Sequence, residues 1–251
     1  MPNAADAIIL CGGAGLRLKG ITGSAPKSLA CIGDRPFLEI LFLQLKRQGF
    51  DEIILAVGHQ SDQIRTYFGD RALGLKIRYS VESTPLGTGG ALRAALGLMH
   101  SATALIMNGD SYTDADLRLF LKQHVAARAD LTAVVVPTDG RVDIGLVSVD
   151  SGNGRVLGFK EKQSVLGPQY VNAGIYLANK NILSEIPAGM QISLESEMFP
   201  RWLSESKNIW AFHHMGSCVD IGTPERYQNA QITLARVEGG APVSLRDHHE
   251  V

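Results

Sequence analysis

Residues 7 to 17 read Ala7-Ile8-Ile9-Leu10-Cys11-Gly12-Gly13-Ala14-Gly15-Leu16-Arg17, a short apolar run that leads straight into a glycine-rich loop ending on a cation. A run of this kind predicts a buried strand. In an open α/β sheet, ligands bind in the crevice beyond the carboxyl ends of the strands. The loop that starts at Leu10 is therefore expected at a binding site.

The rest of the first half alternates short strands with longer helices. Further β-rich apolar runs lie at 53–57, 77–80, 104–107 and 131–136. Between them, Pro36 opens a helix with a 3.6-residue apolar spacing, Gly49 follows its end, and residues 89–98 predict another helix. Asp114 is the expected N-cap of a third helix. That helix would carry Leu117, Phe120, Leu121 and Val125. The pattern indicates an α/β fold with a Rossmann-like, mostly parallel sheet flanked by helices.

After Pro137 the pattern changes to a small β insertion. Residues 145–149 and 156–160 flank Ser151-Gly152-Asn153-Gly154, which has the composition of a tight hairpin turn. The remaining predicted elements are a strand at 171–177, a helix at 193–203 with Phe199, Trp202 and Leu203 buried, and a helix from Pro224 to about Arg236. Because no repeat or long linker interrupts the chain, we expect a single domain over residues 1–251, with a tail at 239–251 that frays.

The composition excludes several classes of function. The 24 basic and 25 acidic residues nearly cancel, so we expect neither nucleic acid nor a membrane as a partner, although a small anionic ligand stays open. The three cysteines are too few and too widely spaced for a disulfide framework or a zinc site. No apolar stretch reaches the length of about 20 residues that a membrane span needs. We therefore expect a cytoplasmic protein.

The loop at Leu10 matches neither of the two commonest nucleotide-binding patterns. A dinucleotide fingerprint starting at Gly13 requires a glycine where Leu18 stands, and a Walker loop requires a lysine after Gly20, where Ile21 stands. Three glycines in four positions still let backbone amides approach phosphate oxygens, and Arg17 offers a planar fork for bidentate phosphate contact. A plain glycine-rich turn explains the loop equally well when it is taken alone.

Other charged residues stand where they could reach the same crevice. Lys27 belongs to a Pro26-Lys27 pair soon after Arg17, Asp110 follows the predicted strand at 104–107, and Asp220 stands in a late Val219-Asp220-Ile221-Gly222 segment. Carboxylates after strands suit Mg²⁺, which takes one or two of them together with phosphate oxygens. When each residue is taken alone, a solvated surface charge explains the lysine equally well. A role in a turn or as a helix cap explains either aspartate equally well.

Together these motifs make the chain resemble the sugar-phosphate nucleotidyltransferase family. The resemblance covers nearly the whole chain, and its motifs follow the family's order: the GG-x-G-x-R loop, the Pro26-Lys27 pair, the loop at 82–90, and Asp220-Ile221-Gly222-Thr223-Pro224. Two departures stand out. The family's first loop usually ends Gly-Thr-Arg, where this chain has Leu16, and Ser28 stands where the family has a second proline.

The resemblance implies a GT-A-like fold and a direct displacement, in which a sugar 1-phosphate oxygen attacks the α-phosphorus of a nucleoside triphosphate and pyrophosphate leaves. It implies that Arg17, Lys27 and Asp110 are catalytic and that Mg²⁺ is held by Asp110 and Asp220. The implied nucleotide contacts are Leu10, Gly12, Gly13, Gly15, Arg17, Lys27, Glu82, Gly87, Thr88 and Asn108. The implied sugar-phosphate contacts are Gly109, Glu161, Lys162, Asn172 and Gly174. The nucleotide-binding part would be about 1–137 and the sugar-phosphate-binding part about 138–238. Homo-oligomers are common in the family, so self-association is compatible with this sequence.

Glu82 bears on the choice of nucleobase. A carboxylate only accepts hydrogen bonds, and guanine presents N1–H and N2–H₂ side by side, whereas a uracil or thymine edge suits an amide better. We therefore expect GTP. The loop also resembles that of guanylyltransferases acting on manno-configured sugars, especially the short chains that use heptose 1-phosphate. Mannose 1-phosphate, or a reaction with UTP, CTP or dTTP, stays as the alternative. Remoter interpretations are a glycosyltransferase, which normally needs a DxD pair, and a catalytically silent nucleotide-sugar sensor.

Overall fold

The computed structural model describes residues 4–13, 15–23, 25–138, 145–161 and 169–237. Its main sheet has ten strands: β1 (Asp6–Leu10), β4 (Glu52–Val57), β5 (Arg71–Ala72), β6 (Leu75–Val81), β7 (Thr103–Asn108), β9 (Leu131–Pro137), β10 (Gly145–Val149), β11 (Val156–Glu161), β12 (Gln169–Asn179) and β13 (Ile209–His213). Two small ladders stand outside it: β2 (Cys31–Ile32) with β3 (Arg35–Pro36), and β8 (Ser111–Thr113) with β14 (Cys218–Asp220).

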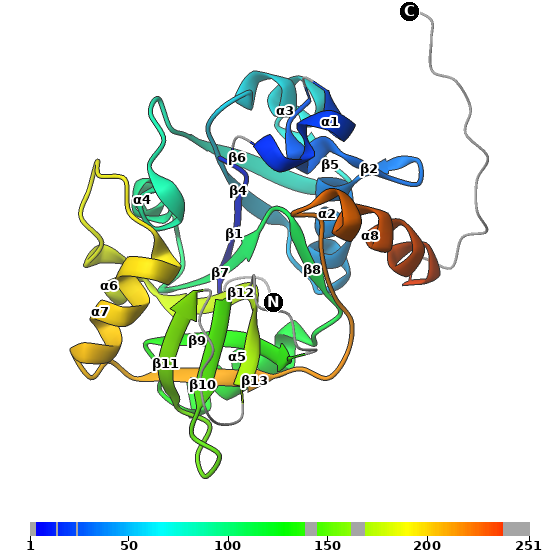
Figure 1. Cartoon of the computed structure of the whole chain (residues 1–251). Coiled ribbons are helices and arrows are strands. Elements are labelled where there is room, and N and C mark those ends of the chain that lie inside the picture. The colour runs from blue at the N-terminus through cyan, green and yellow to red at the C-terminus, as the bar shows by residue number, and fades with distance from the viewer. Residues whose placement is uncertain (1–3, 14, 24, 139–144, 162–168, 238–251) are drawn as a thin grey trace, which may run out of the picture.

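Helices cover both faces of this sheet (Figure 1). They are α1 (Lys19–Thr22), α2 (Phe37–Arg47), α3 (Ser61–Phe68), α4 (Gly87–Ala95), α5 (Leu117–Ala126), α6 (Lys180–Ser184), α7 (Phe199–Ser204) and α8 (Pro224–Val237), with the 3₁₀ turns η1 (Leu16–Leu18), η2 (Lys27–Leu29) and η3 (Leu96–Leu98) and the π-helical turn η4 (Leu194–Met198). In the described part of the chain, no helix combines the length and the apolar character needed to cross a membrane.

Alternation along the strands builds two separate cores. In β1, Ala7 and Ile9 pack with α2, α3, α5 and α8, whereas Ile8 packs on the opposite face with α4, α6, η4 and α7. Successive side chains of a strand point to opposite faces, so a strand buried on both sides reads as an unbroken apolar run. That is why the run before the glycine loop identifies the centre of the sheet.

The sheet consists of a parallel half and a mixed half. Strands β7, β1, β4 and β6 pair in parallel, which confirms the α/β prediction for the first part of the chain. The predicted hairpin also forms, from β10 and β11, and it extends the main sheet because β10 pairs antiparallel with β12. β12 in turn pairs antiparallel with β7. The insertion is therefore continuous with the sheet that carries the glycine loop.

The predicted N-cap of α5 is wrong. The N-cap is Asp116, whose side chain accepts hydrogen bonds from the backbone N–H groups of Arg118 and Leu119. Asp114 instead bonds His214 Nε2 at 2.6 Å. Val125 is exposed, and the neighbouring His124 is buried in its place through bonds to Thr132 and Asn179. A periodic apolar pattern cannot anticipate a buried histidine whose polar atoms find partners in the tertiary structure.

The segment before α7 packs tightly against the start of α4. The backbone N–H groups of Gly89 and Gly90 both donate to Ile192 O, and Ile192 N donates to Leu86 O at 2.8 Å. A Cβ on Gly90 would overlap Met190 O. The glycines of this motif therefore allow one backbone to lie directly on another.

Gly90→Ala is expected to reduce the free energy of unfolding by about 1–3 kcal/mol, because the added methyl group must displace backbone. Gly97→Ala is the matched control, since Gly97 is exposed in η3 with open space around its Cα. Urea unfolding of both variants measures the effect. A Gly90→Ala protein as stable as the control would show that the two segments are not in the contact described.

Candidate active site

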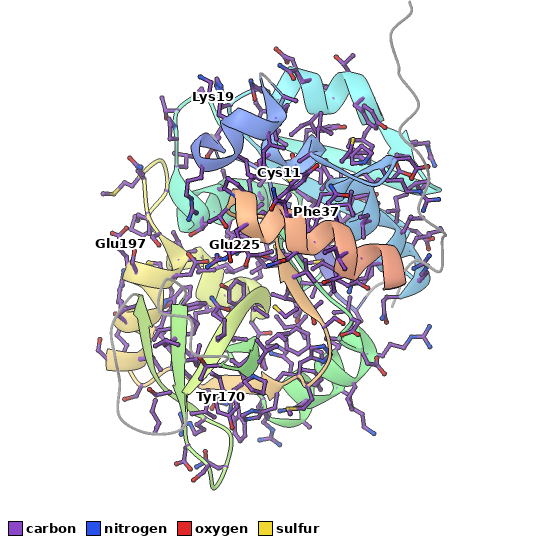
Figure 2. The ribbon with its side chains drawn as sticks, turned by 45° about the vertical axis from the view of Figure 1, so that its right-hand side comes forward. Cys11, Lys19, Phe37, Tyr170, Glu197 and Glu225 are labelled. Carbon is purple, nitrogen blue, oxygen red and sulfur yellow. The ribbon has the colours of Figure 1, made fainter. Side chains whose placement is uncertain are left out.

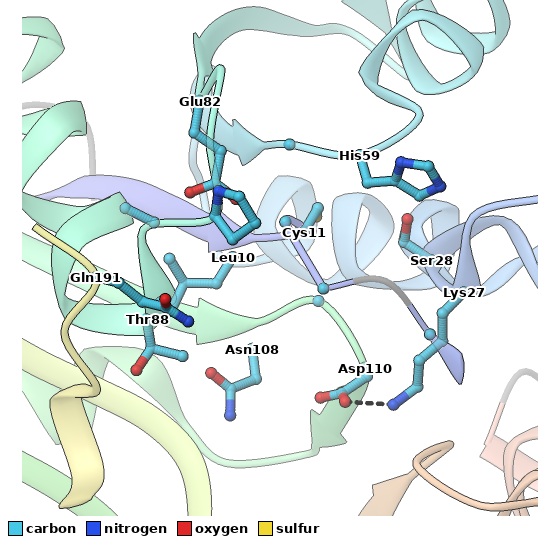
Figure 3. A pocket seen from close by; sticks show the side chains of 18 of the residues that line it. Leu10, Cys11, Lys27, Ser28, His59, Glu82, Thr88, Asn108, Asp110 and Gln191 are labelled. Carbon is cyan, nitrogen blue, oxygen red and sulfur yellow. Dashed lines mark hydrogen bonds and ion pairs between the residues drawn. The ribbon is translucent and has the colours of Figure 1, made fainter. Parts of the chain in front are cut away.

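A cavity of about 820 Å³ opens at the carboxyl ends of β1, β4 and β7 (Figure 3). The structure brings twelve of the predicted site residues to its wall: Leu10, Gly12, Gly13, Gly15, Arg17, Lys27, Glu82, Gly87, Thr88, Asn108, Gly109 and Asp110. They come from separate stretches of sequence that only the parallel pairing brings together. The crevice expected from the strand-end rule is therefore present.

The glycine loop is anchored to the strands on both sides. Cys11 N donates to Ala56 O at 2.7 Å, and Gly109 N donates to Leu10 O at 2.9 Å. Gly15 has φ 60°, and a Cβ there would lie 3.0 Å from the Lys27 Cβ. A glycine at this position meets both the left-handed backbone and the close approach of the lysine. The loop then turns into η1, where Arg17 is exposed and lines the cavity.

Lys27 and Asp110 form an ion pair at the cavity wall. Lys27 Nζ lies 2.5 Å from Asp110 Oδ2, and the lysine side chain is only 14% exposed (Figure 3). The other carboxylate oxygen accepts from the Ser111 hydroxyl at 3.1 Å. A largely buried lysine side chain at the wall of this cavity is well placed to neutralise an incoming anion.

The small β8–β14 ladder brings the second carboxylate to the first. Its register pairs Asp220 with Ser111, and Ile221 N donates to Asp110 O at 2.9 Å. Asp220 Oδ1 accepts from Gly222 N at 2.8 Å and from Arg226 Nη1 at 3.2 Å. Asp220 is thus adjacent to the cavity wall, which Gly222 joins.

These two carboxylates suit a hard cation. Among the described residues there is no group of three or more His, Cys, Asp and Glu side chains arranged to hold a metal. One or two carboxylates are nevertheless the set that Mg²⁺ uses when phosphate oxygens complete its coordination. Each carboxylate has a basic partner, Lys27 or Arg226, so the cluster is balanced in charge before any ligand arrives.

Glu82 projects into the opposite end of the cavity. Leu86 N donates to Glu82 Oε2 at 3.1 Å, and a Cβ on Gly12 or Gly58 would overlap Oε1. Burial raises the pKa of the Glu82 carboxyl, and the Leu86 hydrogen bond opposes that rise. The carboxyl group is therefore fixed in direction and retains acceptor capacity toward the cavity.

The predicted sugar side lies along β12, beside the cavity. Asn172 Nδ2 donates to Tyr176 Oη at 2.6 Å, and Gly174 N donates to Asn172 Oδ1 at 3.1 Å. Gly174, with φ 72°, packs directly on the side chain of Asn108. The β10–β11 register places the Glu161 backbone opposite Gly145, whose Cα in turn faces Asn172. The Glu161 side chain and the whole of Lys162 lie outside the described residues.

Several cavity residues were not among the predicted ones. Gly58 and His59 follow β4, so the strand-end rule that found Asp110 could have found them. Ser28 lines the cavity at 5% exposure with its hydroxyl unbonded, and Gln191 reaches the wall from the segment before α7. Cys11 also lines the wall, but burial raises the pKa of its thiol, so it stays protonated. Ser28 and Gln191 carry no signal in the sequence.

Comparison with known proteins agrees with this geometry. The nucleotidyl transferase family pattern matches residues 6–236. The chain is 36% identical to the D-glycero-alpha-D-manno-heptose 1-phosphate guanylyltransferase of Aneurinibacillus thermoaerophilus, over 91% of this chain and 98% of the relative. It is 35% identical to the mannose-1-phosphate guanylyltransferase of Mycobacterium tuberculosis, over 97% of this chain and 68% of that protein. The crystal structure of HddC from Yersinia pseudotuberculosis complexed with GMP-PN superposes with a TM-score of 0.80 at 30% identity, covering 92% of this chain and 99% of HddC.

These matches extend over nearly the whole chain, so they include the parallel half-sheet and the loop that ends on Arg17. The chain therefore belongs to the nucleotidyl transferase family.

Proposed function

We propose that the chain transfers a guanylyl group from GTP to D-glycero-α-D-manno-heptose 1-phosphate, giving the GDP-activated heptose and pyrophosphate. The observation that carries this proposal is the cavity itself, with Glu82 at one end and the Lys27–Asp110 pair at the other. The activities for which these relatives are named support the choice of GTP and of a manno-configured sugar. The near-complete coverage of the heptose relative supports heptose in particular.

The proposed reaction is one displacement at phosphorus. An oxygen of the sugar 1-phosphate forms a bond to the α-phosphorus of GTP while the bond to the β-phosphate oxygen breaks and pyrophosphate leaves. Such a reaction is accelerated by positioning and by neutralising charge, and needs no protein nucleophile. Lys27 would neutralise the charge of the α-phosphate. Arg17, at the outer end of the glycine loop, would neutralise the charge of the leaving pyrophosphate.

Asp110 and Asp220 would hold Mg²⁺, which supplies charge neutralisation to phosphate oxygens when bound. Asn172 keeps one lone pair of its Oδ1 for a sugar hydroxyl, because its other bonds go to Gly174 N and Tyr176 Oη. Asn108 Oδ1 is buried at the cavity without a hydrogen-bond partner and is a second acceptor for the substrates. Glu161 and Lys162 are proposed to complete the sugar-phosphate side.

Glu82→Gln is expected to raise the KM for GTP by about 10- to 100-fold, the value of one charged hydrogen bond. Leu86 N–H would hold the amide oxygen of glutamine, which turns its NH₂ toward the N–H edge of guanine. Two donors would then face each other. Initial-rate kinetics measure the change, with Glu205→Gln as the control because Glu205 pairs with Arg201 on the surface. An unchanged KM for GTP would remove Glu82 from base recognition.

The same contact predicts a pH dependence. The carboxylate must be ionised to accept from guanine, and burial raises its pKa. As pH falls through that raised pKa, the KM for GTP should increase, at a pH above that at which an exposed glutamate takes up its proton. Glu82→Gln should lack this step. If the KM for GTP rose by the same factor in the variant as pH falls, the pH dependence would belong to another titrating group.

The identity of the sugar is tested by product analysis. GTP and Mg²⁺ are incubated with heptose 1-phosphate or mannose 1-phosphate, and the GDP-sugars are identified by mass spectrometry. The proposal predicts a higher kcat/KM for the heptose. A higher value for mannose 1-phosphate favours the second candidate, which the mycobacterial relative supports.

A further inference from the structure

One carboxylate in the π-helical turn η4 bridges the two sides of the site from outside the cavity. Glu195 is half-buried, and both of its oxygens accept hydrogen bonds from hydroxyl groups. Thr88 Oγ1 donates to Oε2 at 2.7 Å, and Tyr176 Oη donates to Oε1 at 3.1 Å. Thr88 belongs to α4, on the nucleotide side, and Tyr176 to β12, on the sugar side. Single π-helical turns within α-helices are often found at functional sites.

On the nucleotide side, Glu195 adds to an attachment that is already strong. Thr88 Oγ1 also accepts from Leu194 N at 2.8 Å. Backbone bonds from Gly89 and Gly90 to Ile192 hold the same two segments together. Loss of the Glu195 contact would therefore leave the start of α4 in place.

On the sugar side, the Tyr176 hydroxyl donates to no acceptor other than Glu195 among the residues that the structure describes. Tyr176 is fully buried, and its hydroxyl donates to Glu195 while it accepts from Asn172 Nδ2 at 2.6 Å. Burial first, and then the charge of Glu195, raises the pKa of Tyr176 well above its usual value, so the hydroxyl keeps the proton that it donates. The chain of bonds runs from Glu195 through Tyr176 to Asn172.

We propose that Glu195 is a positioning residue that orients Asn172 through the Tyr176 hydroxyl and so sets the affinity for the sugar 1-phosphate. This inference rests on the proposed function, because it assigns Asn172 to the sugar. The Tyr176 hydroxyl needs an acceptor that cannot also donate to it, and a carboxylate is the side chain that only accepts. A glutamine at this position offers one acceptor oxygen to two hydroxyl donors, so its NH₂ group would face one of them and the chain of bonds could not stay complete. Once the bond to Tyr176 is lost, Asn172 is held only through its bond from Gly174 N and its Nδ2 no longer has a fixed acceptor.

The test separates the two substrates. Glu195→Gln should raise the KM for the sugar 1-phosphate at least about tenfold, while the KM for GTP stays within about threefold, because the start of α4 keeps its backbone bonds. Tyr176→Phe, which removes only the hydroxyl, should likewise raise the KM for the sugar 1-phosphate and leave the KM for GTP nearly unchanged. The double variant should be no worse than either single variant, since all three break the same chain of bonds.

Glu197→Gln is the matched control. Glu197 lies in the same turn, at the outer edge of the molecule (Figure 2), and its carboxylate accepts from Ser193 N instead of from the site. It should leave both KM values unchanged. Glu195→Asp provides a second variant if Glu195→Gln is unstable, because the shorter carboxylate keeps its charge but cannot reach both hydroxyls.

Three results would overturn the inference: an unchanged KM for the sugar 1-phosphate in Glu195→Gln, equal rises for both substrates, or additive effects of Glu195→Gln and Tyr176→Phe. Each of these three kinetic comparisons requires that the wild-type protein is active. A wild-type protein that turns over no GTP and sugar pair contradicts the proposed function instead. In that case, calorimetric titration of heptose 1-phosphate into wild type and Glu195→Gln, with a non-hydrolysable GTP analogue present, makes the comparison without turnover. Equal affinities there would again contradict the role of Glu195.

Discussion

Lys27→Ala is expected to lower kcat by about 100- to 1,000-fold, the usual effect of removing one preorganised charge contact from a transition state. The lysine side chain is only 14% exposed and lines the cavity, so water replaces its charge poorly. Removing it also leaves the charge of Asp110 without its partner. The rate of pyrophosphate release under saturating substrates measures the change.

Lys46→Ala controls for the loss of a lysine as such, because Lys46 pairs with Asp51 on the surface. Lys27→Arg keeps the charge on a longer and flatter group, and should recover only part of the activity. Near-normal turnover in Lys27→Ala would remove this lysine from the proposed mechanism.

Asp110→Asn should lower kcat/KM by a similar factor of about 100 to 1,000 and raise the Mg²⁺ concentration needed for half-maximal rate. The substitution keeps the size of the side chain and the backbone bond from Ile221 N to Asp110 O, so the β8–β14 ladder should stay intact. What it removes is the carboxylate charge that Mg²⁺ requires. A Mg²⁺ titration of wild type and variant makes the comparison.

Asp114→Asn is the control for Asp110→Asn. Asp114 lies just beyond β8 but bonds His214 and is absent from the cavity wall. A normal Mg²⁺ titration for Asp110→Asn would place the metal elsewhere.

The sequence was informative wherever the signal was local. The apolar run before Leu10, the glycines after it and the strand-end position of Asp110 each follow from rules about one segment, and the structure brings these residues to one cavity. The helix that begins after Pro36 was predicted for the same reason, because its stripe of Phe37, Leu38 and Leu41 is regular and fully buried.

Features that depend on residues far away in the chain could not be predicted from one sequence. Asp116 caps α5, which begins at Leu117, whereas Asp114 bonds His214, a hundred residues later in the chain. Glu195 carries no motif of its own, and its position between Thr88 and Tyr176 exists only after β12 and α4 have packed. In the sequence, Gly87, Gly89 and Gly90 belong to the family motif at 82–90, which also contains Glu82. In the structure Gly89 and Gly90 bind the segment that carries Glu195.

The central claim is guanylyl transfer to a sugar 1-phosphate, and the direct measurement is pyrophosphate release from a panel of nucleoside triphosphates. GTP, UTP, CTP, dTTP and ATP are each supplied with Mg²⁺ and with heptose 1-phosphate or mannose 1-phosphate, and kcat/KM is determined for every pair. The account predicts the highest value for GTP with heptose 1-phosphate and no pyrophosphate when the sugar phosphate is omitted. Faster turnover with a pyrimidine triphosphate, or no pyrophosphate from any pair, would contradict it.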